Sequence, residues 1–402
     1  MNVIALKKPY LLFGLLSLSG AACAESNWDF SGNIELESRY FVESPQFDAQ
    51  DDQKFQNAVD STLEFRWRNN DGNQRISIIP YLRWDAQDNE RSLVDLQESY
   101  WALESNNLEL LVGINTVFWG VTESVHLVDI INQTDSVADI DGEQKLGQAM
   151  INLAWQQDWG LLNVFVLPGF RERTFAGIEG RLRTPVAVDN DRANFESGAD
   201  KNHVDFALRY SHYIGDFDIG ISYFSGTSRE ARFTINENGT QLIPIYDQIN
   251  QLGFDGQYTK DAWLWKLEAI VRQGHSDTFV AAIGGFEYTQ YQIFDTNADL
   301  GYLLEYQYDD RDDEEPLSIA DNDIFAGARL ALNDPQDTSV LAGIVYDHES
   351  DEVFLNVEAE TRIGDNYTIT GRARFINNTD SSDALDSLSE DDYIEISIAR
   401  YF

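Results

Sequence analysis

Apolar and polar residues alternate along most of this chain with a period of two residues. In segment 28–41, Ile34 and Leu36 fall on one face of an extended backbone, and Glu35 lies between them on the other. Because successive side chains of a β-strand point to opposite faces, the pattern predicts strands with one apolar and one polar face. We expect about 18 such strands, over residues 28–41, 59–69, 74–85, 94–103, 108–115, 147–156, 161–169, 203–214, 216–225, 247–258, 262–274, 278–291, 298–308, 322–332, 338–347, 353–362, 367–376 and 393–402.

A soluble β-sandwich also shows this alternation, so other features must distinguish it from a membrane-spanning barrel. The polar faces are densely charged, as the wall of a water-filled lumen is. Tryptophan and tyrosine stand at the ends of the apolar faces, where a girdle at the membrane surface requires them: Trp84, Trp155, Tyr223, Tyr288, Tyr308 and Tyr367. These features predict an all-β chain that forms a single transmembrane antiparallel β-barrel.

The connections between the predicted strands alternate between tight and long. Tight ones include 69–72 and 364–366, and long ones include 116–146 and 170–202. Bacterial outer-membrane barrels have this pattern, with short periplasmic turns and long extracellular loops, and an even strand number that places both chain ends in the periplasm. The alternative is a barrel of about 16 strands, because Glu98 disturbs the alternation in its segment.

The first residues have the three parts of a secretory signal peptide. A basic start precedes an apolar run at 10–18, and the small residues Ala22 and Ala24 mark a cleavage site. This run is shorter than the roughly 20 residues that a membrane-spanning helix needs. We therefore expect a signal peptide at 1–24 and the barrel at 25–402. Cleavage would remove two lysines and the single cysteine, and would change the net charge from −41 to −43. Such acidity excludes a general nucleic-acid binder.

The chain ends in an apolar strand that terminates at Phe402. Ile394, Ile396 and Ile398 lie on the same face as this residue. The end resembles the recognition signal that Gram-negative outer-membrane barrels present to the barrel assembly machinery, although Arg400 stands where an apolar residue is usual. The resemblance implies a location in the outer membrane, with lipid and lipopolysaccharide as partners.

Further stretches make the chain similar to a proteobacterial family of uncharacterised, porin-like outer-membrane β-barrels. These stretches are 117–120 with 129–132, 167–173, 285–289, 303–306 and 322–327. The resemblance covers most of the chain that follows the signal peptide. It implies the fold and the location, and it implies transport without naming the solute.

Segment 116–146 is too long and too apolar for a plain surface loop of a compact barrel. Long connections of this kind are usually functional or mobile. We predict that the segment folds into the lumen, with a short helix near 125–131. The residues predicted to narrow the pore are Trp119, Gly120, Glu123 and Asp129. The alternative is an outward surface loop.

Arginines gather in segment 170–192, whereas most other predicted outer loops are acidic. Guanidinium groups bind carboxylates and phosphates through paired donors. The predicted solute-binding residues are therefore Arg171, Arg173, Arg181 and Arg183, and the alternative is that they pair with nearby carboxylates. The polar strand faces predict lumen charges of both signs, among them Arg66, Arg83, Arg209, Arg272, Glu268 and Glu305.

Together these features predict passive transport by a porin-like channel, or by a substrate-specific uptake barrel, for a small hydrophobic or anionic solute. The five histidines show no metal-ligand spacing, and no serine lies in a nucleophile motif. We therefore expect no enzyme activity, no metal and no cofactor. Two alternatives stay open: an outer-membrane enzyme with its active site at the rim, and a structural or adhesive barrel whose lumen is plugged.

Overall fold

The computed structural model describes residues 27–319, 322–380 and 383–402. The predicted signal peptide lies outside these residues. An 18-stranded sheet dominates the structure, so the prediction of about 18 strands is confirmed. Its strands are β1 (Trp28–Phe41), β2 (Phe55–Arg68), β3 (Gln74–Asp85), β4 (Leu93–Ser105), β5 (Leu108–Asn115), β6 (Gln148–Gln157), β7 (Gly160–Pro168), β9 (Val204–Ile214), β10 (Phe217–Thr227), β13 (Gln248–Lys260), β14 (Trp263–Gln273), β15 (Phe279–Gln290), β16 (Asp299–Asp309), β17 (Asp323–Ala331), β18 (Ser339–Asp347), β19 (Val353–Ile363), β20 (Tyr367–Asn377) and β21 (Tyr393–Tyr401).

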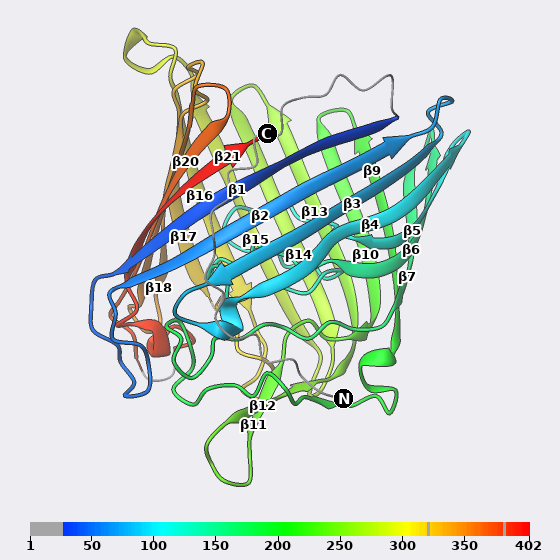
Figure 1. Ribbon diagram of the computed structural model, residues 1–402. Coiled ribbons are helices and arrows are strands. Elements are labelled where there is room, and N and C mark those ends of the chain that lie inside the picture. The colour runs from blue at the N-terminus through cyan, green and yellow to red at the C-terminus, as the bar shows by residue number, and fades with distance from the viewer. Residues whose placement is uncertain (1–26, 320–321, 381–382) are drawn as a thin grey trace.

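The large sheet closes on itself into a barrel (Figure 1). The last strand, β21, pairs antiparallel with β1, for instance through Ile398 and Leu36. Phe402 extends this pairing, since its carbonyl accepts a hydrogen bond of 3.1 Å from the Gly32 N–H and its own N–H donates to the Gly32 carbonyl over 3.0 Å. Closure therefore leaves no unpaired edge of this sheet in contact with lipid, as a hydrocarbon environment requires.

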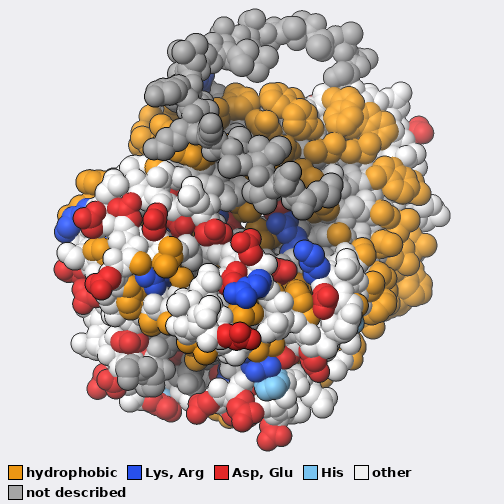
Figure 2. Space-filling view, turned by 60° about the horizontal axis from the view of Figure 1, so that its bottom comes forward, with side chains coloured by type: hydrophobic (Ala, Val, Ile, Leu, Met, Phe, Trp, Pro, Cys, Tyr) orange, Lys and Arg blue, Asp and Glu red, His pale blue; other side chains and the backbone are white. Residues whose placement is uncertain are grey.

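The apolar faces point outward and the polar faces point into the lumen, as the alternation predicts. Leu267 and Glu268 are neighbours on β14, yet Leu267 is 43% exposed on the outer surface whereas Glu268 is 0% exposed. Trp263, Trp265 and Phe286 form an aromatic group near a tight turn, with ring centroids 5.3–5.6 Å apart. Hydrophobic side chains cover the flank of the barrel (Figure 2). This belt of apolar side chains with aromatic groups at its ends is the lipid-facing surface of an outer-membrane protein.

The irregular pattern around Glu98 is a β-bulge. The register between β3 and β4 shifts between Ile79 and Pro80, because Gln97 is an extra residue on β4. The shift changes the phase of the alternation, so Glu98 faces the lumen and accepts a hydrogen bond of 2.5 Å from Ser77. A single inserted residue is thus the reason why the sequence pattern left the strand number open.

Tight turns lie at the end of the barrel that carries the C-terminus, and long connections lie at the opposite end (Figure 1). Two of the long connections form a small sheet beyond the barrel, with strands β8 (Asn194–Phe195), β11 (Arg232–Ile235) and β12 (Leu242–Tyr246). The helical elements of the described residues are the short 3-10 turns η1 (Asn89–Arg91), η2 (Asp200–Asn202), η3 (Ile293–Asp295) and η4 (Asp386–Leu388). None of the helices in this part of the chain is long and apolar enough to cross a membrane.

The assignment of the two faces can be tested with one arginine on each. We expect Leu267→Arg to impair membrane insertion, because an arginine on the lipid face near mid-membrane costs about 2–4 kcal/mol. Glu360 on β19 is exposed and belongs to the lumen face, so Glu360→Arg should assemble as the wild type does. The measurement is the fraction of unheated protein that migrates as the folded species on a denaturing gel. Equal losses in the two variants would contradict the assigned faces.

Candidate functional site

Residues 116–146, here named the inward segment, enter the lumen and pack against one side of its wall. Trp119, Val128 and Ile131 are at most 4% exposed. They share one apolar cluster with wall residues from β5 to β15, among them Leu111, Met150, Phe165, Leu167, Phe224, Ile249, Ile270 and Phe279. The prediction that this segment folds inward is therefore confirmed. This cluster fills the side of the lumen against which the inward segment packs.

Two buried carboxylates of the wall bind the tip of the inward segment. Glu268 on β14 accepts hydrogen bonds from the backbone N–H groups of Val121 (2.7 Å), Thr122 (3.0 Å) and Val128 (3.2 Å), and from the Thr122 hydroxyl (2.7 Å). Glu305 on β16 accepts bonds from the backbone N–H groups at positions 123 (2.8 Å) and 124 (2.9 Å). Hydrogen bonds to an ionised acceptor are among the stronger ones in proteins. The two strands therefore fix the path of the tip.

The predicted short helix at 125–131 is wrong. The backbone there is irregular, with single turns. An α-helix leaves its first N–H groups without partners inside the helix and then bonds each later N–H to the carbonyl four residues before it. Here the N–H of Val128 turns to the wall and bonds Glu268, and the N–H of Asp129 bonds the His126 carbonyl in a single turn that is not continued. The carboxylates of the barrel thus replace the hydrogen bonds of a helix.

A second set of contacts holds the far part of the inward segment on the opposite side of the lumen. Asp139 is 2.9 Å from the guanidinium of Arg374 on β20 and accepts a hydrogen bond of 2.6 Å from the hydroxyl of Tyr393 on β21. Asp135 accepts a hydrogen bond of 2.7 Å from Arg83 on β3. The segment therefore spans the lumen, with each end region attached to a different part of the wall.

His126 lies at the centre of the lumen between two carboxylates. Its Nε2 is 3.1 Å from Glu143 and its Nδ1 is 3.7 Å from Glu268. Burial by itself lowers the pKa of His126, but the two carboxylates outweigh burial and raise the pKa to about 10. The imidazole is therefore protonated at neutral pH and ties the tip of the segment to Glu143 in the part of the segment that precedes β6.

This raised pKa predicts an alkaline transition. A group whose pKa is higher in the folded protein stabilises the fold fully below its ordinary pKa of 6.5 and stops doing so as the pH rises through about 10. We expect the inward segment to loosen above about pH 10, seen as faster proteolytic cleavage within it. His126→Gln should cleave at one rate across this range. A wild-type cleavage rate that does not change near pH 10 would contradict the role of the imidazolium.

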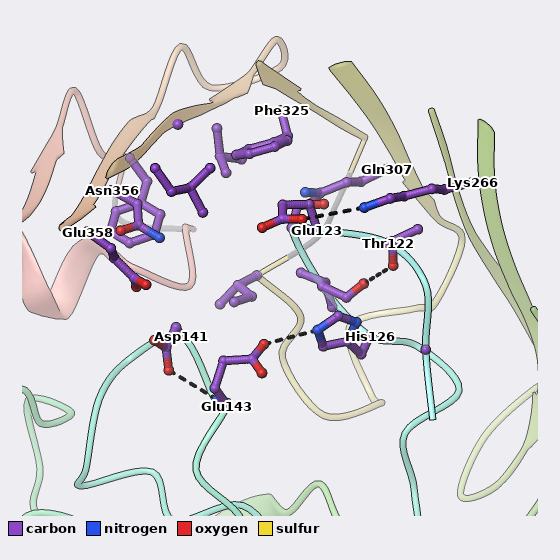
Figure 3. Close-up of a pocket in the computed structure, with 18 of the residues that line it drawn as sticks. Thr122, Glu123, His126, Asp141, Glu143, Lys266, Gln307, Phe325, Asn356 and Glu358 are labelled. Carbon is purple, nitrogen blue, oxygen red and sulfur yellow. Dashed lines mark hydrogen bonds and ion pairs between the residues drawn. The ribbon is translucent and has the colours of Figure 1, made fainter. Parts of the chain in front are cut away.

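Two cavities remain beside the inward segment. The inner cavity, of about 590 Å³, reaches toward the tight-turn end, where Leu264 and Arg329 line it. The outer cavity, of about 390 Å³, is lined by residues of the long connections such as Phe175 and Leu388. Figure 3 shows the inner cavity, with Glu123 of the segment beside Gln307 and Lys266 of the wall, and with Asn356 and Glu358 on the opposite side. The two cavities have several lining residues in common: Val125, His126, Ile140, Asp141, Glu143, Ile319 and Leu385. We name this group the neck.

The residues predicted to narrow the pore lie in the inward segment, but they do not all face a cavity. Gly120 and Glu123 line the inner cavity, and Asp129 lines the outer one. Trp119 lines neither, because its ring is buried against Phe165, with 5.7 Å between the ring centroids. In this position Trp119 anchors the segment to the wall and does not block the passage itself.

The four predicted solute-binding arginines divide into two kinds. Arg171 forms an ion pair with Asp95, and Arg181 forms one with Asp391. Arg173 and Arg183 line the outer cavity, and the structure shows no carboxylate of the described residues within 4.0 Å of either guanidinium. Arg183 donates to backbone carbonyls, for example that of residue 178 over 3.1 Å. Arg171 therefore ties its connection to β4, and Arg181 ties two long connections together. The last two arginines lack such a carboxylate partner among the described residues.

The predicted lumen charges lie on the inner face and form pairs. Arg209 makes a two-pronged bond to Asp255 (2.7 and 2.8 Å), and Arg272 donates to Glu230 over 2.5 Å. Arg66 pairs with Glu64 over 3.0 Å near the tight-turn end and is largely exposed. Arg83, Glu268 and Glu305 hold the inward segment, as described above. These charges thus serve mainly to fix the contents of the lumen.

Sequence reasoning missed several residues that shape this site. His126 and Asp139 were not singled out, although a histidine and several acids in a segment that is expected to fold into the lumen are a signal that could have been used. Gln307 on β16 and Asn356 on β19, which line the inner cavity, gave no signal at all. In the sequence, an uncharged amide on a polar strand face cannot be distinguished from the other polar residues that point into the lumen.

Comparisons with known proteins agree with this fold. No protein-family model matches the chain, and no curated protein matches it in sequence. Among solved structures, the chain is similar to Wzi, a carbohydrate-binding β-barrel of the Escherichia coli outer membrane that is involved in group 1 capsule assembly. The identity is 9%, the alignment covers 92% of this chain and 84% of Wzi, and the TM-score is 0.52. It is also similar to OccK11 (OpdR) of Pseudomonas aeruginosa, with 11% identity, 93% and 95% coverage and a TM-score of 0.52. At these identities the likeness shows the fold alone, and this fold, with its lipid-facing belt, places the chain among porin-like barrels of the bacterial outer membrane.

Proposed function

We propose that the chain is a passive channel, and not an enzyme, that admits a small anionic solute across the outer membrane. The observation that carries this proposal is the pair of cavities that adjoin at the neck. One reaches the long-connection end of the lumen and the other reaches toward the tight-turn end. A fully plugged structural barrel would have no reason to keep such spaces beside its inward segment.

The charge of the outer cavity favours an anion. Besides Arg173 and Arg183, the guanidinium groups of Arg229, Arg272 and Arg311 line it. Arg272 and Arg311 both contact Glu230, at 2.5 and 3.3 Å, and Arg311 also pairs with Asp309 over 2.6 Å. Arg229 pairs with Asp205 over 2.7 Å. Burial lowers the pKa of Arg173, as expected for a cation that lacks a close carboxylate. Five carboxylates also line this cavity, those of Asp129, Asp139, Asp141, Glu143 and Glu230. The positive charge that has no carboxylate of the described residues within 4.0 Å is therefore that of Arg173 and Arg183.

This basic cavity lies within a surface of the opposite sign. Figure 2 shows the long-connection end, where acidic side chains are widespread and several basic ones lie among them. The whole chain has a formal net charge of −41. Its outer rim thus repels anions in general, and the arginines of the outer cavity give a local site at which a small anion is stabilised.

Ion selectivity of the refolded protein in a planar bilayer tests this proposal. Under a KCl gradient we expect a reversal potential that shows a preference for chloride, and we expect Arg173→Gln with Arg183→Gln to reduce that preference. Arg66→Gln is the matched control, since Arg66 is an exposed arginine that lines neither cavity. A wild-type protein that folds but carries no current would overturn the channel in favour of a plugged barrel. A cation preference would overturn the choice of an anion.

A further inference from the structure

The inner cavity has a feature that passive conduction of an anion does not require: one of its amides, that of Gln307, is buried without a hydrogen-bond partner in the described part of the chain, whereas its charged groups other than Glu352 are paired. Glu123 is 2.7 Å from the guanidinium of Arg329 and 3.4 Å from the amino group of Lys266. His126 is paired with Glu143, as described above. The side-chain oxygen and nitrogen of Gln307 are buried, and neither has a hydrogen-bond partner among the described residues.

The position of Gln307 on its strand makes this lack of partners conspicuous. Gln307 is 1% exposed and lies between two other inward-facing residues of β16. Glu305 on one side accepts the N–H groups of the inward segment, and Asp309 on the other side accepts a hydrogen bond of 2.8 Å from Arg311. A buried amide without a partner is unfavourable, and native proteins rarely keep one unless a ligand or water satisfies it.

A second amide lines the same cavity three strands away. The oxygen of Asn356 accepts a hydrogen bond from Arg374, and its nitrogen has no partner among the described residues. Figure 3 shows Gln307 and Asn356 on different sides of the cavity. The cavity therefore presents uncharged hydrogen-bonding groups from two directions.

An apolar floor lies between the two amides. Phe325 on β17 is the register partner of Val345 on β18, and Val345 is in turn the register partner of Phe354 on β19. All three residues line the cavity. Gly343 makes room for the first ring, since a Cβ at that position would come within 2.3 Å of it. Aromatic and aliphatic groups in a row suit the carbon skeleton of a solute, and amides beside them suit its hydroxyl or amide groups.

We propose that the inner cavity is a binding site for the uncharged polar part of the solute, and that the transported class is small carboxylates that also carry hydroxyl or amide groups. This inference rests on the proposed function, since the carboxylate is what the outer cavity would attract. In the inner cavity, Gln307 and Asn356 bond the hydroxyl or amide groups, and the floor contacts the carbon skeleton. The arginines of the outer cavity attract the carboxylate of the solute. The two amides of the inner cavity then discriminate among solutes of equal charge.

The test compares solutes that have the same charge and differ in hydrogen-bonding groups. Gluconate against hexanoate tests hydroxyl groups, and hippurate against 4-phenylbutyrate tests the amide. The measured quantity is the solute concentration that halves the KCl conductance of a single channel. We expect Gln307→Met to raise this concentration about three- to tenfold for gluconate, for hippurate or for both, as the loss of one or two neutral hydrogen bonds implies. It should leave the values for hexanoate and 4-phenylbutyrate unchanged.

Methionine is close to glutamine in length and removes an amide that has no partner, so this variant should fold as well as the wild type. Gln257→Met is the matched control, because Gln257 lines the same cavity but already donates to Asp218 over 3.1 Å. Equal half-blocking concentrations in the wild type and Gln307→Met, for both gluconate and hippurate, would overturn the inference and indicate that only water satisfies Gln307. An absence of block by these two solutes in the wild type would also overturn it.

Binding of the same four solutes in detergent micelles, measured by isothermal titration calorimetry, separates this inference from the proposed function. If the protein carries no current but binds gluconate or hippurate in a way that depends on Gln307, the channel fails and the site stands. If it conducts anions and no binding depends on Gln307, the site fails and the channel stands.

Discussion

Replacing Glu268 with alanine is expected to free the tip of the inward segment and to raise the single-channel conductance. Glu268 is 0% exposed, and its carboxylate holds three backbone N–H groups and one hydroxyl of the segment. Alanine removes the acceptor of the three N–H groups, whereas the Thr122 hydroxyl keeps the Val125 carbonyl as its acceptor over 2.6 Å. Loss of one partner from a buried charged network typically costs about 3–5 kcal/mol. The tip should then leave its place beside the wall, and the space open to ions should widen.

Two further variants bracket this result. Deletion of 122–142 removes most of the tip and four of the five neck residues of the segment, all but Glu143, while leaving all barrel strands intact. Its conductance should therefore be at least that of Glu268→Ala, and larger solutes should pass. Glu360→Ala removes another lumen carboxylate, for which the structure shows no ion pair among the described residues, and should conduct nearly as the wild type does. If Glu268→Ala folds and conducts as the wild type does, Glu268 does not hold the segment. If the deletion variant folds and also conducts unchanged, the segment does not limit the pore.

Replacing Arg374 with methionine is expected to cause the largest loss of stability. Arg374 is 1% exposed, and its guanidinium lies 2.9 Å from Asp139, 3.1 Å from Asp141 and 2.5 Å from Glu358. Without the guanidinium, three carboxylates remain close together in the lumen with less positive charge nearby. Removing one partner of a buried ion pair typically costs about 3–5 kcal/mol. Urea unfolding followed by tryptophan fluorescence measures the loss.

The pH dependence of this loss identifies its electrostatic cause. Burial by itself raises the pKa of Asp139, but Arg374 and the neighbouring arginines outweigh burial and lower the pKa below its ordinary value of 3.8. A carboxyl of this kind stabilises the fold above its ordinary pKa, and this contribution is lost as the pH falls through the lowered value. The difference between the wild type and Arg374→Met should therefore be largest at neutral pH and should shrink toward pH 4, where the unpaired carboxyls of the variant take up protons.

Arg362 provides the control for this prediction. It pairs with Asp337 over 2.7 Å, but both side chains are more than half exposed. Exposed ion pairs contribute about 0–1 kcal/mol, so Arg362→Met should unfold close to the wild type at every pH. Equal destabilisation of the two variants, or a loss for Arg374→Met that does not change with pH, would contradict the charge argument.

The barrel could be predicted from the sequence because its rules are local. A residue on a barrel strand faces lipid or lumen according to whether its position is odd or even, so alternation alone assigned Leu267 outward and Glu268 inward. The order of tight and long connections likewise follows from strand direction. The alternation of apolar and polar residues is interrupted at Gln97, an extra residue that shifts the following residues of β4 to the opposite face. In the sequence, such a bulge looks the same as a polar residue placed on an apolar face.

The contents of the lumen were decided by tertiary structure. That segment 116–146 would fold inward followed from its length and composition, but its conformation did not, because its hydrogen-bond acceptors come from strands 140–182 positions away along the chain. The same holds for the arginines of segment 170–192. Arg181 meets Asp391 across 210 positions, whereas Arg173 meets no carboxylate of the described residues. Sequence determines which side chains enter the lumen, but only barrel closure determines which of them meet. The pairing that results leaves Arg173 and Arg183 without a carboxylate partner, and Gln307 without a hydrogen-bond partner, among the described residues.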